Sequence, residues 1–461
     1  GGWLFYRADV DSVCGKGCRD PTQLRRRAAT GYSQGEAVQP DPRIAILDFQ
    51  AQLAHRGIHL VVLPIPVKPV IQADHLAGSV TPGQTVENAS FPVFLRELQA
   101  AGIDVVDPTA DLAALARPGE MSPYLKTDTH WRPEAVDRVA SLLAERVRSR
   151  LAPIIAGRTP ALRRVAVTVT NRGDIAGLLG FDATGGQGAV PAETVTTQEV
   201  HDEYGAFWQP RPNADVLLLG DSFTNIYSLD GMGWGRSAGL AEQLSYHLNR
   251  PVDRIVRNDE SAVATRRILA RDLAAGRDRL AGKKVVIWQF ASRELCYGRW
   301  QYVALDLHAP AKTDFLTVAP GNVLPVTGTI AAVSPVPAPG TVPYKDHVCA
   351  VHLVDVTTAG NDALKQQAVV YLEGMHDNVW TPAANLRVGD TLRLRLRPWS
   401  DVAPRYESVN RTELEDVNLQ LQEPSWAEMT GDTAGAVGQN LHYGGWTTWA
   451  ALLVVLTCGT A

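Results

Sequence analysis

Short apolar runs alternate with helical patterns along roughly the first 300 residues, and this alternation constrains the fold of the chain most strongly. Apolar runs typical of buried strands lie at 60–64, 103–106, 216–219 and 285–288. Helical patterns lie at 94–98, from Pro133 onward, and at 268–280. Pro133 suits a first helical turn, where its missing N–H costs nothing, and the apolar residues that follow recur on one face: Val136, Val139, Leu143 and Val147. The pattern predicts an α/β fold, in which helices cover both faces of a sheet.

Two changes in pattern suggest how the chain is divided. Between 151 and 213 the alternation weakens to loops at 185–188 and 210–213 around a strand-like run at 165–169, which we interpret as an insertion in one domain spanning 1–304. From 305 to 461 proline and glycine become dense and the apolar runs become short, with strand candidates at 349–354, 368–372 and 391–396 and a turn at 388–390. This second part should be a smaller, mostly-β C-terminal domain, either a barrel or a sandwich.

The overall charge excludes some classes of partner. The 461 residues carry a formal net charge of −5, and no basic stretch marks a nucleic-acid or anionic-lipid surface. We therefore expect no nucleic-acid partner. A neutral or sugar-like substrate is compatible with this charge.

The cysteines and the ends of the chain bear on its compartment. Cys14 and Cys18 are close enough for a small disulfide loop but could also be two free thiols, and we favour the disulfide. No second Cys/His pair with ligand spacing supports a zinc site. The chain starts without a recognisable signal peptide, as a trimmed product would. The apolar run at 449–458 is shorter than the roughly 20 residues that span a bilayer, so we expect a buried strand or helix, or the start of a longer segment.

The strongest chemical signal is the sequence Gly220-Asp221-Ser222 directly after the apolar run at 216–219. A glycine turn at the end of a parallel strand places the next side chain at the carboxyl edge of the sheet, where open α/β folds bind ligands. Ser222 could present its hydroxyl there as a nucleophile, and its backbone N–H could stabilise an oxyanion. It could equally be a helix N-cap.

A second signal supplies the base that a serine nucleophile needs. In Thr127-Asp128-Thr129-His130, just before the helix at Pro133, two polar side chains two residues apart can converge on one cleft. Asp128 would orient the imidazole of His130, which would then take the proton of Ser222. The alternative is that His130 is a surface residue near a helix start.

Several segments together resemble the alginate O-acetyltransferase family, the AlgJ/AlgX-like proteins with an SGNH-hydrolase-like domain. They are Gly2-Trp3-Leu4-Phe5-Tyr6, the stretch 124–131, the stretch 172–179 and Gly220-Asp221-Ser222-Phe223, and the resemblance covers roughly residues 1 to 300. It implies an SGNH-hydrolase-like α/β/α sandwich in a periplasmic or otherwise exported protein. It also implies that Ser222 is the nucleophile, His130 the base and Asp128 its orienting partner.

The activity implied by the resemblance is transfer of an acetyl group, through an acetyl-serine, to a hydroxyl of alginate or another exopolysaccharide. A membrane O-acyltransferase system would supply the acetyl donor, and neither a cofactor nor a metal ion is required. Two alternatives remain: a carbohydrate acetylesterase on the same fold, in which water takes the acetyl group, and a non-catalytic polysaccharide-binding scaffold.

Other polar residues are weaker candidates for this site. Asn258, after the apolar stretch that ends at Val256, could donate to the oxyanion or simply cap a loop. Tyr227 and Arg293 could hold an anionic sugar, although Arg293 could equally be a surface charge or pair with Glu294.

The C-terminal domain could be a carbohydrate-binding module. Aromatic side chains stack on sugar rings and arginines pair with uronate carboxylates, and this domain contains both: Tyr371, Trp380, Trp399, Arg393, Arg395 and Arg397. Alternation of these arginines with leucines is also what any half-buried strand shows, and we favour this simpler interpretation.

Overall fold

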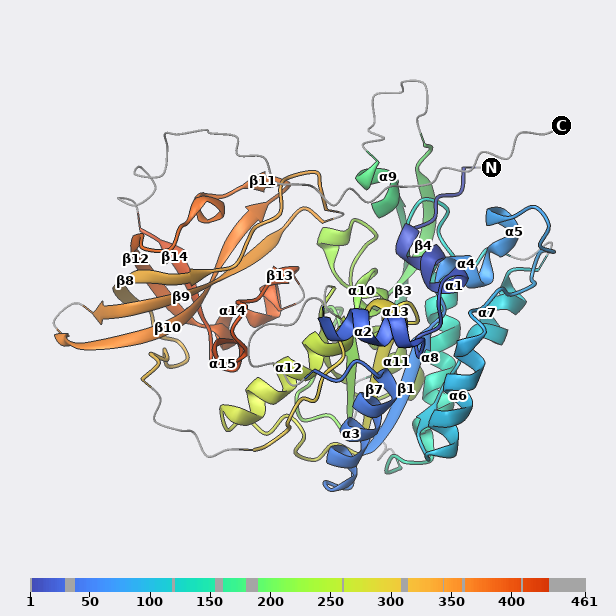
Figure 1. Cartoon of the computed structure of the whole chain (residues 1–461), viewed down its shortest axis with the longest axis horizontal. Coiled ribbons are helices and arrows are strands. Elements are labelled where there is room, and N and C mark those ends of the chain that lie inside the picture. The colour runs from blue at the N-terminus through green and yellow to red at the C-terminus, as the bar shows by residue number, and fades with distance from the viewer. Residues whose placement is uncertain are drawn as a thin grey trace.

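A parallel sheet of five strands forms the centre of the N-terminal part of the computed structural model (Figure 1). The structure describes residues 2–430 except 30–37, 118–120, 154–160, 180–189, 259–260, 308–313, 343, 359–360 and 408. The strand order is β2-β1-β7-β5-β6, with all neighbours parallel. The strands are β1 (His59–Ile65), β2 (Asp104–Val105), β5 (Val216–Gly220), β6 (Asp253–Val256) and β7 (Val285–Ala291). The predicted strands at 60–64, 103–106, 216–219 and 285–288 are thereby confirmed.

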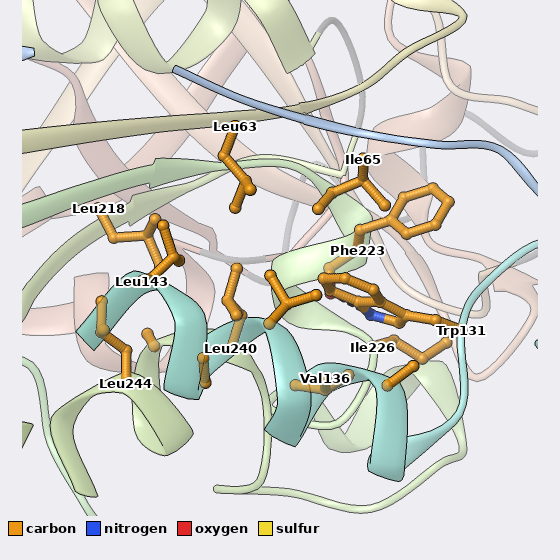
Figure 2. Packing of buried hydrophobic residues seen from close by; sticks show 14 of the residues in the cluster. Leu63, Ile65, Trp131, Val136, Leu143, Leu218, Phe223, Ile226, Leu240 and Leu244 are labelled. Atoms are coloured by element: carbon orange, nitrogen blue, oxygen red, sulfur yellow. Dashed lines mark hydrogen bonds between the residues drawn. The ribbon is translucent and has the colours of Figure 1, made fainter. Parts of the chain in front are cut away.

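Helices cover both faces of this sheet, because its strands are apolar on both sides. In β1, Leu63 points into one hydrophobic cluster and Val62 into the other. The first cluster is closed by α8 (Pro133–Arg148) and α11 (Leu240–Leu248), as Figure 2 shows. The second is closed by α3 (Pro42–Ala54), α6 (Ser90–Ala100) and α12 (Ser261–Ala274). This is the predicted α/β/α sandwich.

Shorter helices lie around the sandwich. They are α1 (Arg7–Cys14), α2 (Pro21–Ala29), α4 (Lys68–Ile71), α5 (Ala73–Leu76), α7 (Thr109–Leu115), α9 (Asp174–Leu178), α10 (Ser222–Asn225), α13 (Glu294–Tyr297) and the 3₁₀ turn η1 (Asp230–Met232).

Two helix predictions had different outcomes. Pro133 begins α8, and the apolar residues after it are buried as expected. The pattern at 268–280 is helical only to Ala274, so its predicted end is wrong. The chain leaves the helix at Gly276, which has a φ of 77° in the left-handed region that favours glycine.

The segment 151–213 contains an antiparallel hairpin outside the central sheet. It consists of β3 (Arg163–Asn171) and β4 (Glu193–His201), so the predicted strand at 165–169 is confirmed. Its second strand lies against α8 and α11. The predicted loop at 185–188 lies outside the described residues. That the whole segment is an insertion stays a prediction.

The C-terminal part is a β-barrel, which lies to the left of the sandwich in Figure 1. The barrel closes because β9 pairs with both β8 and β10. Its strands are β8 (Leu324–Val333), β9 (His347–Thr358), β10 (Asn361–His376), β12 (Thr391–Pro398) and β14 (Ser425–Met429). Further elements are β11 (Val379–Trp380), β13 (Arg411–Thr412), α14 (Trp399–Tyr406), α15 (Val417–Gln420) and η2 (Pro382–Asn385). The mostly-β prediction is confirmed, whereas the division between 304 and 305 stays a prediction.

The packing of the barrel explains why most of the residues considered for sugar binding have the types that they have. In β12 the leucines point inward and Arg393 and Arg395 point outward, as expected of a half-buried strand. Tyr371 and Trp399 are buried and pack against each other, so the idea that they stack on sugar rings is wrong. Trp380 is 47% exposed and remains available. A carbohydrate-binding role for the barrel stays a prediction.

A carboxylate with 15% of its side chain exposed joins the sandwich to the barrel. Glu413 of the barrel part accepts hydrogen bonds from Arg257 Nη1 of the sandwich (3.0 Å), Arg411 Nε (2.9 Å) and Tyr371 Oη (2.9 Å). Burial alone would raise the pKa of Glu413, but the charges of the surrounding arginines outweigh burial and lower this pKa to about 2. This charged contact therefore links the two parts of the chain, as does the ion pair between Arg277 and Glu423 (2.6 Å).

Glu413→Gln should destabilise the fold by about 3 kcal/mol at pH 7, because Arg257 and Arg411 would lose their buried counter-charge. The lowered pKa of Glu413 means that its contribution is complete above the unfolded pKa of about 4.5 and is lost as the pH falls toward 2. The difference in unfolding free energy between wild type and variant should therefore shrink over that range in urea titrations. The exposed Glu415 provides the matched control, Glu415→Gln. Equal effects of both substitutions would contradict the expectation.

The expected disulfide between Cys14 and Cys18 is not formed. Both are free thiols, as are Cys296 and Cys349. Cys14 is exposed at the end of α1, whereas Cys18 is buried in the hydrophobic cluster closed by α3, α6 and α12, so the two side chains lie in different environments.

Among the described residues no helix is long and apolar enough to cross a membrane. The apolar run at 449–458 lies outside them.

Candidate active site

Ser222 lies at the carboxyl edge of the sheet, where β5 ends and α10 begins. The turn is tight, because a Cβ on Gly220 would lie 2.2 Å from Thr224 Oγ1. Asp221 caps α10 by accepting from Phe223 N, and it also accepts from Gln289 Nε2 (2.7 Å) and Ala291 N (2.7 Å) of β7. The neighbouring strand therefore fixes the turn that presents Ser222.

His130 comes from a hairpin-like loop before α8. Tyr124 and Trp131 form a bridge at its base, and Leu125 N donates to His130 O (3.1 Å). Trp131 Nε1 then donates to Phe223 O (2.9 Å), next to the serine. The loop and the turn of Ser222 are thus attached directly to each other, although they are 92 residues apart.

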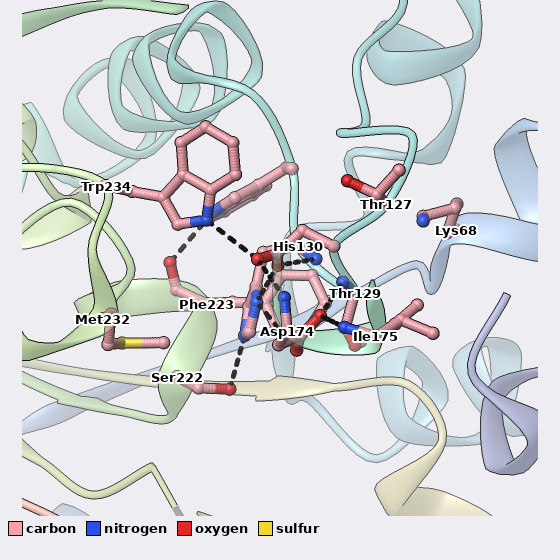
Figure 3. Close-up of polar contacts among 12 residues, drawn as sticks. Lys68, Thr127, Thr129, His130, Asp174, Ile175, Ser222, Phe223, Met232 and Trp234 are labelled. Atoms are coloured by element: carbon pink, nitrogen blue, oxygen red, sulfur yellow. Dashed lines mark hydrogen bonds and ion pairs between the residues drawn. The ribbon is translucent and has the colours of Figure 1, made fainter. Parts of the chain in front are cut away.

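The predicted serine, histidine and aspartate are joined in that order by hydrogen bonds. Figure 3 shows the bond between Ser222 and His130. His130 Nε2 is 2.8 Å from Ser222 Oγ, and His130 Nδ1 is 2.7 Å from Asp128 Oδ1. All three residues are buried, with 7% of Ser222, 4% of His130 and 2% of Asp128 exposed. The ring of Phe223 packs on the imidazole at 4.8 Å between ring centroids.

Each oxygen of Asp128 accepts two hydrogen bonds. Oδ1 accepts from the backbone N–H (3.0 Å) and Nδ1 of His130, and Oδ2 accepts from Asp174 N (3.0 Å) and Trp234 Nε1 (2.8 Å). Asp174 can approach so closely because Gly173 has a φ of 84°, and a Cβ there would lie 2.7 Å from the backbone of Thr127. Four donors hold the carboxylate in one orientation.

These contacts shift the pKa values of Asp128 and His130. Burial would raise the pKa of Asp128 and lower that of His130, but the hydrogen bond and the attraction between them outweigh burial. The pKa of Asp128 is therefore lowered and that of His130 raised. Asp174 is 3.7 Å from His130 Nδ1, and burial together with the charge of Asp128 raises the pKa of Asp174.

Two charged features lie near the serine, the histidine and the aspartate: the buried Lys68 and the ion pair between Arg293 and Asp9. Lys68 follows β1, and its Nζ donates to Leu4 O (2.7 Å) and Lys126 O (3.2 Å), tying the N-terminal segment to the histidine loop. Its pKa is lowered to about 8 by burial. Arg293 Nη1 donates to the buried Asp9 (3.0 Å), and its guanidinium lies 5.9 Å from the ring centroid of Phe223.

The three weaker candidates have different surroundings. Tyr227 is fully buried and donates to Trp131 O (2.7 Å), so the prediction that it holds a sugar is wrong. Arg293 lies beside the ring that follows Ser222 and also 3.8 Å from Glu294, so its sugar-binding role stays a prediction. Asn258 follows β6. Its Oδ1 accepts from Asn225, and its Nδ2 donates to Asn410 (2.7 Å). That Asn258 donates to an oxyanion stays a prediction.

Sequence reasoning missed three residues that orient the group. Asp174 lies in the stretch 172–179 that carried the family resemblance, yet nothing in the sequence connected it to Asp128. Gln289 is a polar residue in an apolar strand, a signal that would have identified it. Trp234 follows an irregular segment and has no local signal.

Asp128, His130 and Asp174 could also hold a metal ion, since one ligand atom of each lies within 4.8 Å of the others. Most of the atoms that could bind a metal already take part in hydrogen bonds, however. The carboxylate of Asp128 accepts four hydrogen bonds, and Asp174 Oδ1 accepts from Thr129 N and Ile175 N. This donor set fits a hydrogen-bonded network better than metal ligation. A hydroxyl, an imidazole and a carboxylate in this order can activate the hydroxyl for attack on an ester.

The chain also matches known proteins. Residues 2–292 match the family described as SGNH hydrolase-like domain, acetyltransferase AlgX. A probable alginate O-acetylase AlgJ of Pseudomonas aeruginosa is 31% identical over 134 residues, which are 29% of this chain and 33% of that protein. The chain thus spans about a third of the length of this relative.

Several solved structures resemble the chain, among them two O-acetylation proteins of Pseudomonas. The O-acetyltransferase domain of Pseudomonas putida AlgJ has a TM-score of 0.47 at 18% identity, covering 65% of this chain and 91% of that one. Pseudomonas aeruginosa AlgX has a TM-score of 0.39 at 13% identity, covering 80% and 88%. The assignment rests on the family model, which matches well over half of the sequence. The chain belongs to the family of AlgX-type acetyltransferases with an SGNH hydrolase-like domain.

Proposed function

We propose that this protein is a polysaccharide O-acetyltransferase that works through an acetyl-serine at Ser222. The observation that carries the proposal is the continuous series of hydrogen bonds from Ser222 Oγ through His130 to Asp128. Family membership supports acetyl transfer as the reaction class. His130 is the general base, and Asp128 holds its tautomer and orientation.

In the first half-reaction, His130 Nε2 takes the proton of Ser222 as Oγ attacks the carbonyl carbon of the acetyl donor. The backbone N–H of Ser222, at the start of α10, can stabilise the oxyanion. When the intermediate collapses, the donor's leaving oxygen takes the proton from His130. In the second half-reaction a sugar hydroxyl gives its proton to His130 and attacks the carbonyl carbon of the acetyl-serine. When the bond from that carbon to Oγ breaks, His130 passes the proton to Oγ, which regenerates Ser222.

The acceptor in this proposal is a hydroxyl of an alginate-like or other exopolysaccharide. Arg293 is the candidate to bind an acceptor carboxylate, because Asp9 holds it beside the ring of Phe223 with 17% of its side chain exposed. The membrane O-acyltransferase system as donor and the exported location belong to the same proposal, supported by the family resemblance.

Incubation with p-nitrophenyl acetate, with and without oligosaccharide acceptors, tests the proposal. The expected result is acetylated oligosaccharide, formed at the expense of hydrolysis. If water takes the acetyl group at the same rate whether or not an oligosaccharide is present, the protein is an acetylesterase. If the wild-type protein releases no acetyl group from this ester or from other acetyl donors, the chain is a binding scaffold and the proposal is wrong.

Acetyl release should depend on the protonation of His130. Only the neutral imidazole can take the serine proton, and its pKa is raised above the ordinary value of 6.5. The acidic limb of a kcat/KM profile should therefore have its midpoint above pH 6.5, with activity rising as the pH increases through it. In Asp128→Asn the limb should move to lower pH, because Asp128 is the main cause of the raised pKa. An unchanged limb in that variant would contradict the assignment.

A further inference from the structure

Three asparagine side chains connect the barrel to the helix that contains Ser222. Asn410 Oδ1, from the barrel part, accepts from Asn258 Nδ2 (2.7 Å), and Asn258 Oδ1 accepts from Asn225 Nδ2 (2.9 Å). Asn225 is the last residue of α10, one helical turn after Ser222. The connection therefore runs from the barrel part to the end of the helix that begins with Ser222.

Asn410 is firmly held at the barrel end of this series. It directly precedes β13, it is 4% exposed, and its backbone O accepts from Val348 N of β9 (2.9 Å). The next residue, Arg411, accepts through its backbone O from Arg257 Nη2 (2.5 Å). The segment that contains Asn410 thus also contacts the sandwich directly.

The helix at the other end depends on its surroundings. With four residues, α10 is too short to be stable on its own, so tertiary contacts must set its orientation. Asp221 and Gln289 fix its beginning, whereas Asn225 lies at its end and is fully buried. Asn258 bonds to that end from the carboxyl edge of β6.

The direction of the hydrogen bonds matters. An asparagine side chain offers an acceptor on one side and donors on the other, so its partners decide which way it points. Because Asn410 presents an oxygen, Asn258 turns its NH₂ group toward the barrel and its oxygen toward α10. Asn225 must in turn present its NH₂ group to Asn258.

We infer that Asn410 is a positioning residue of the acetyl-transfer site: through Asn258 and Asn225 it holds α10, and hence Ser222, in line with His130. The inference rests on the proposed function and extends it, because it makes the barrel part of the catalytic apparatus. It requires an acceptor at position 410.

Two substitutions of similar size separate this role from simple packing. Asn410→Leu removes the acceptor, whereas Asn410→Asp keeps it. We expect Asn410→Leu to lower kcat for p-nitrophenyl acetate about tenfold, with little change in KM, as expected for one lost hydrogen bond that orients the nucleophile. Asn410→Asp should recover most of this loss. The exposed Asn322 of the barrel part provides the control, Asn322→Leu, which should behave like wild type.

Thermal unfolding is measured for every variant, and Ser222→Ala is assayed alongside. If Asn410→Leu lowers the Tm but leaves kcat per folded molecule unchanged, Asn410 is only structural and the inference is wrong. Equal losses in the Leu and Asp variants would also overturn it. If Asn410→Leu does not fold, Asn410→Ser, which is too short to reach Asn258, is used and interpreted in the same way.

The result also separates this inference from the proposed function. An active wild type, an inactive Ser222→Ala and a fully active Asn410→Leu would contradict the role of Asn410 alone. A wild type that releases no acetyl group would contradict both.

Discussion

Ser222→Ala should lower the rate of acetyl release by roughly 10⁴- to 10⁶-fold. Alanine removes the only oxygen within hydrogen-bonding distance of His130 Nε2 among the described residues, so no acetyl-enzyme can form. The turn itself should survive, because Asp221 and Gln289 hold it through atoms that the substitution leaves in place. Release of p-nitrophenol from p-nitrophenyl acetate measures the effect, and circular dichroism confirms the fold.

Two further variants strengthen this test. His130→Ala should be as inactive as Ser222→Ala, and the double variant should be no worse than either, because the two residues act as one unit. Ser141→Ala is the matched control: Ser141 lies on α8, and its hydroxyl donates to Glu145 of the same helix (3.4 Å). A Ser222→Ala variant with wild-type activity would refute the assignment of the nucleophile.

Asp128→Asn should reduce kcat by roughly 10⁴-fold. Each oxygen of Asp128 accepts two N–H groups, so an NH₂ group at either position would face two donors. The imidazole would then lose the partner that keeps its Nδ1 protonated and its Nε2 free to take the proton of Ser222. Steady-state kinetics on the same ester measure this loss.

The control for Asp128→Asn is Asp306→Asn, on an exposed aspartate. Retained secondary structure in the Asp128 variant, by circular dichroism, would show that the loss is chemical rather than a loss of fold. If the variant keeps more than a tenth of the wild-type kcat, Asp128 does not orient His130.

The central fold could be predicted because its signals are local. Three of the parallel strands, β1, β5 and β7, are mostly apolar runs. Pro133 with the apolar face after it defines α8 without reference to the rest of the chain. Leucines alternating with arginines define β12 in the same way. Closure of the barrel depends on β9 pairing with both β8 and β10, which is a long-range property that no local pattern encodes.

The same distinction explains the site. The sequence could single out Ser222, Asp128 and His130 as candidates because a glycine turn after a strand and an Asp-x-His sequence are short motifs. Trp234 donates to Asp128 although the two residues are 106 positions apart in the sequence, so no short motif indicates this contact. Tyr227 was assigned wrongly because its position five residues after Ser222 suggested the cleft, whereas its hydroxyl is buried against Trp131.

The most direct test of the account is to trap the acetyl-enzyme. The protein is mixed with p-nitrophenyl acetate, quenched in acid during turnover, digested and analysed by mass spectrometry. One acetyl group on Ser222, which disappears when an oligosaccharide acceptor is added before the quench, is the predicted result. Turnover with an unmodified Ser222, or with the acetyl group on another residue, would contradict it.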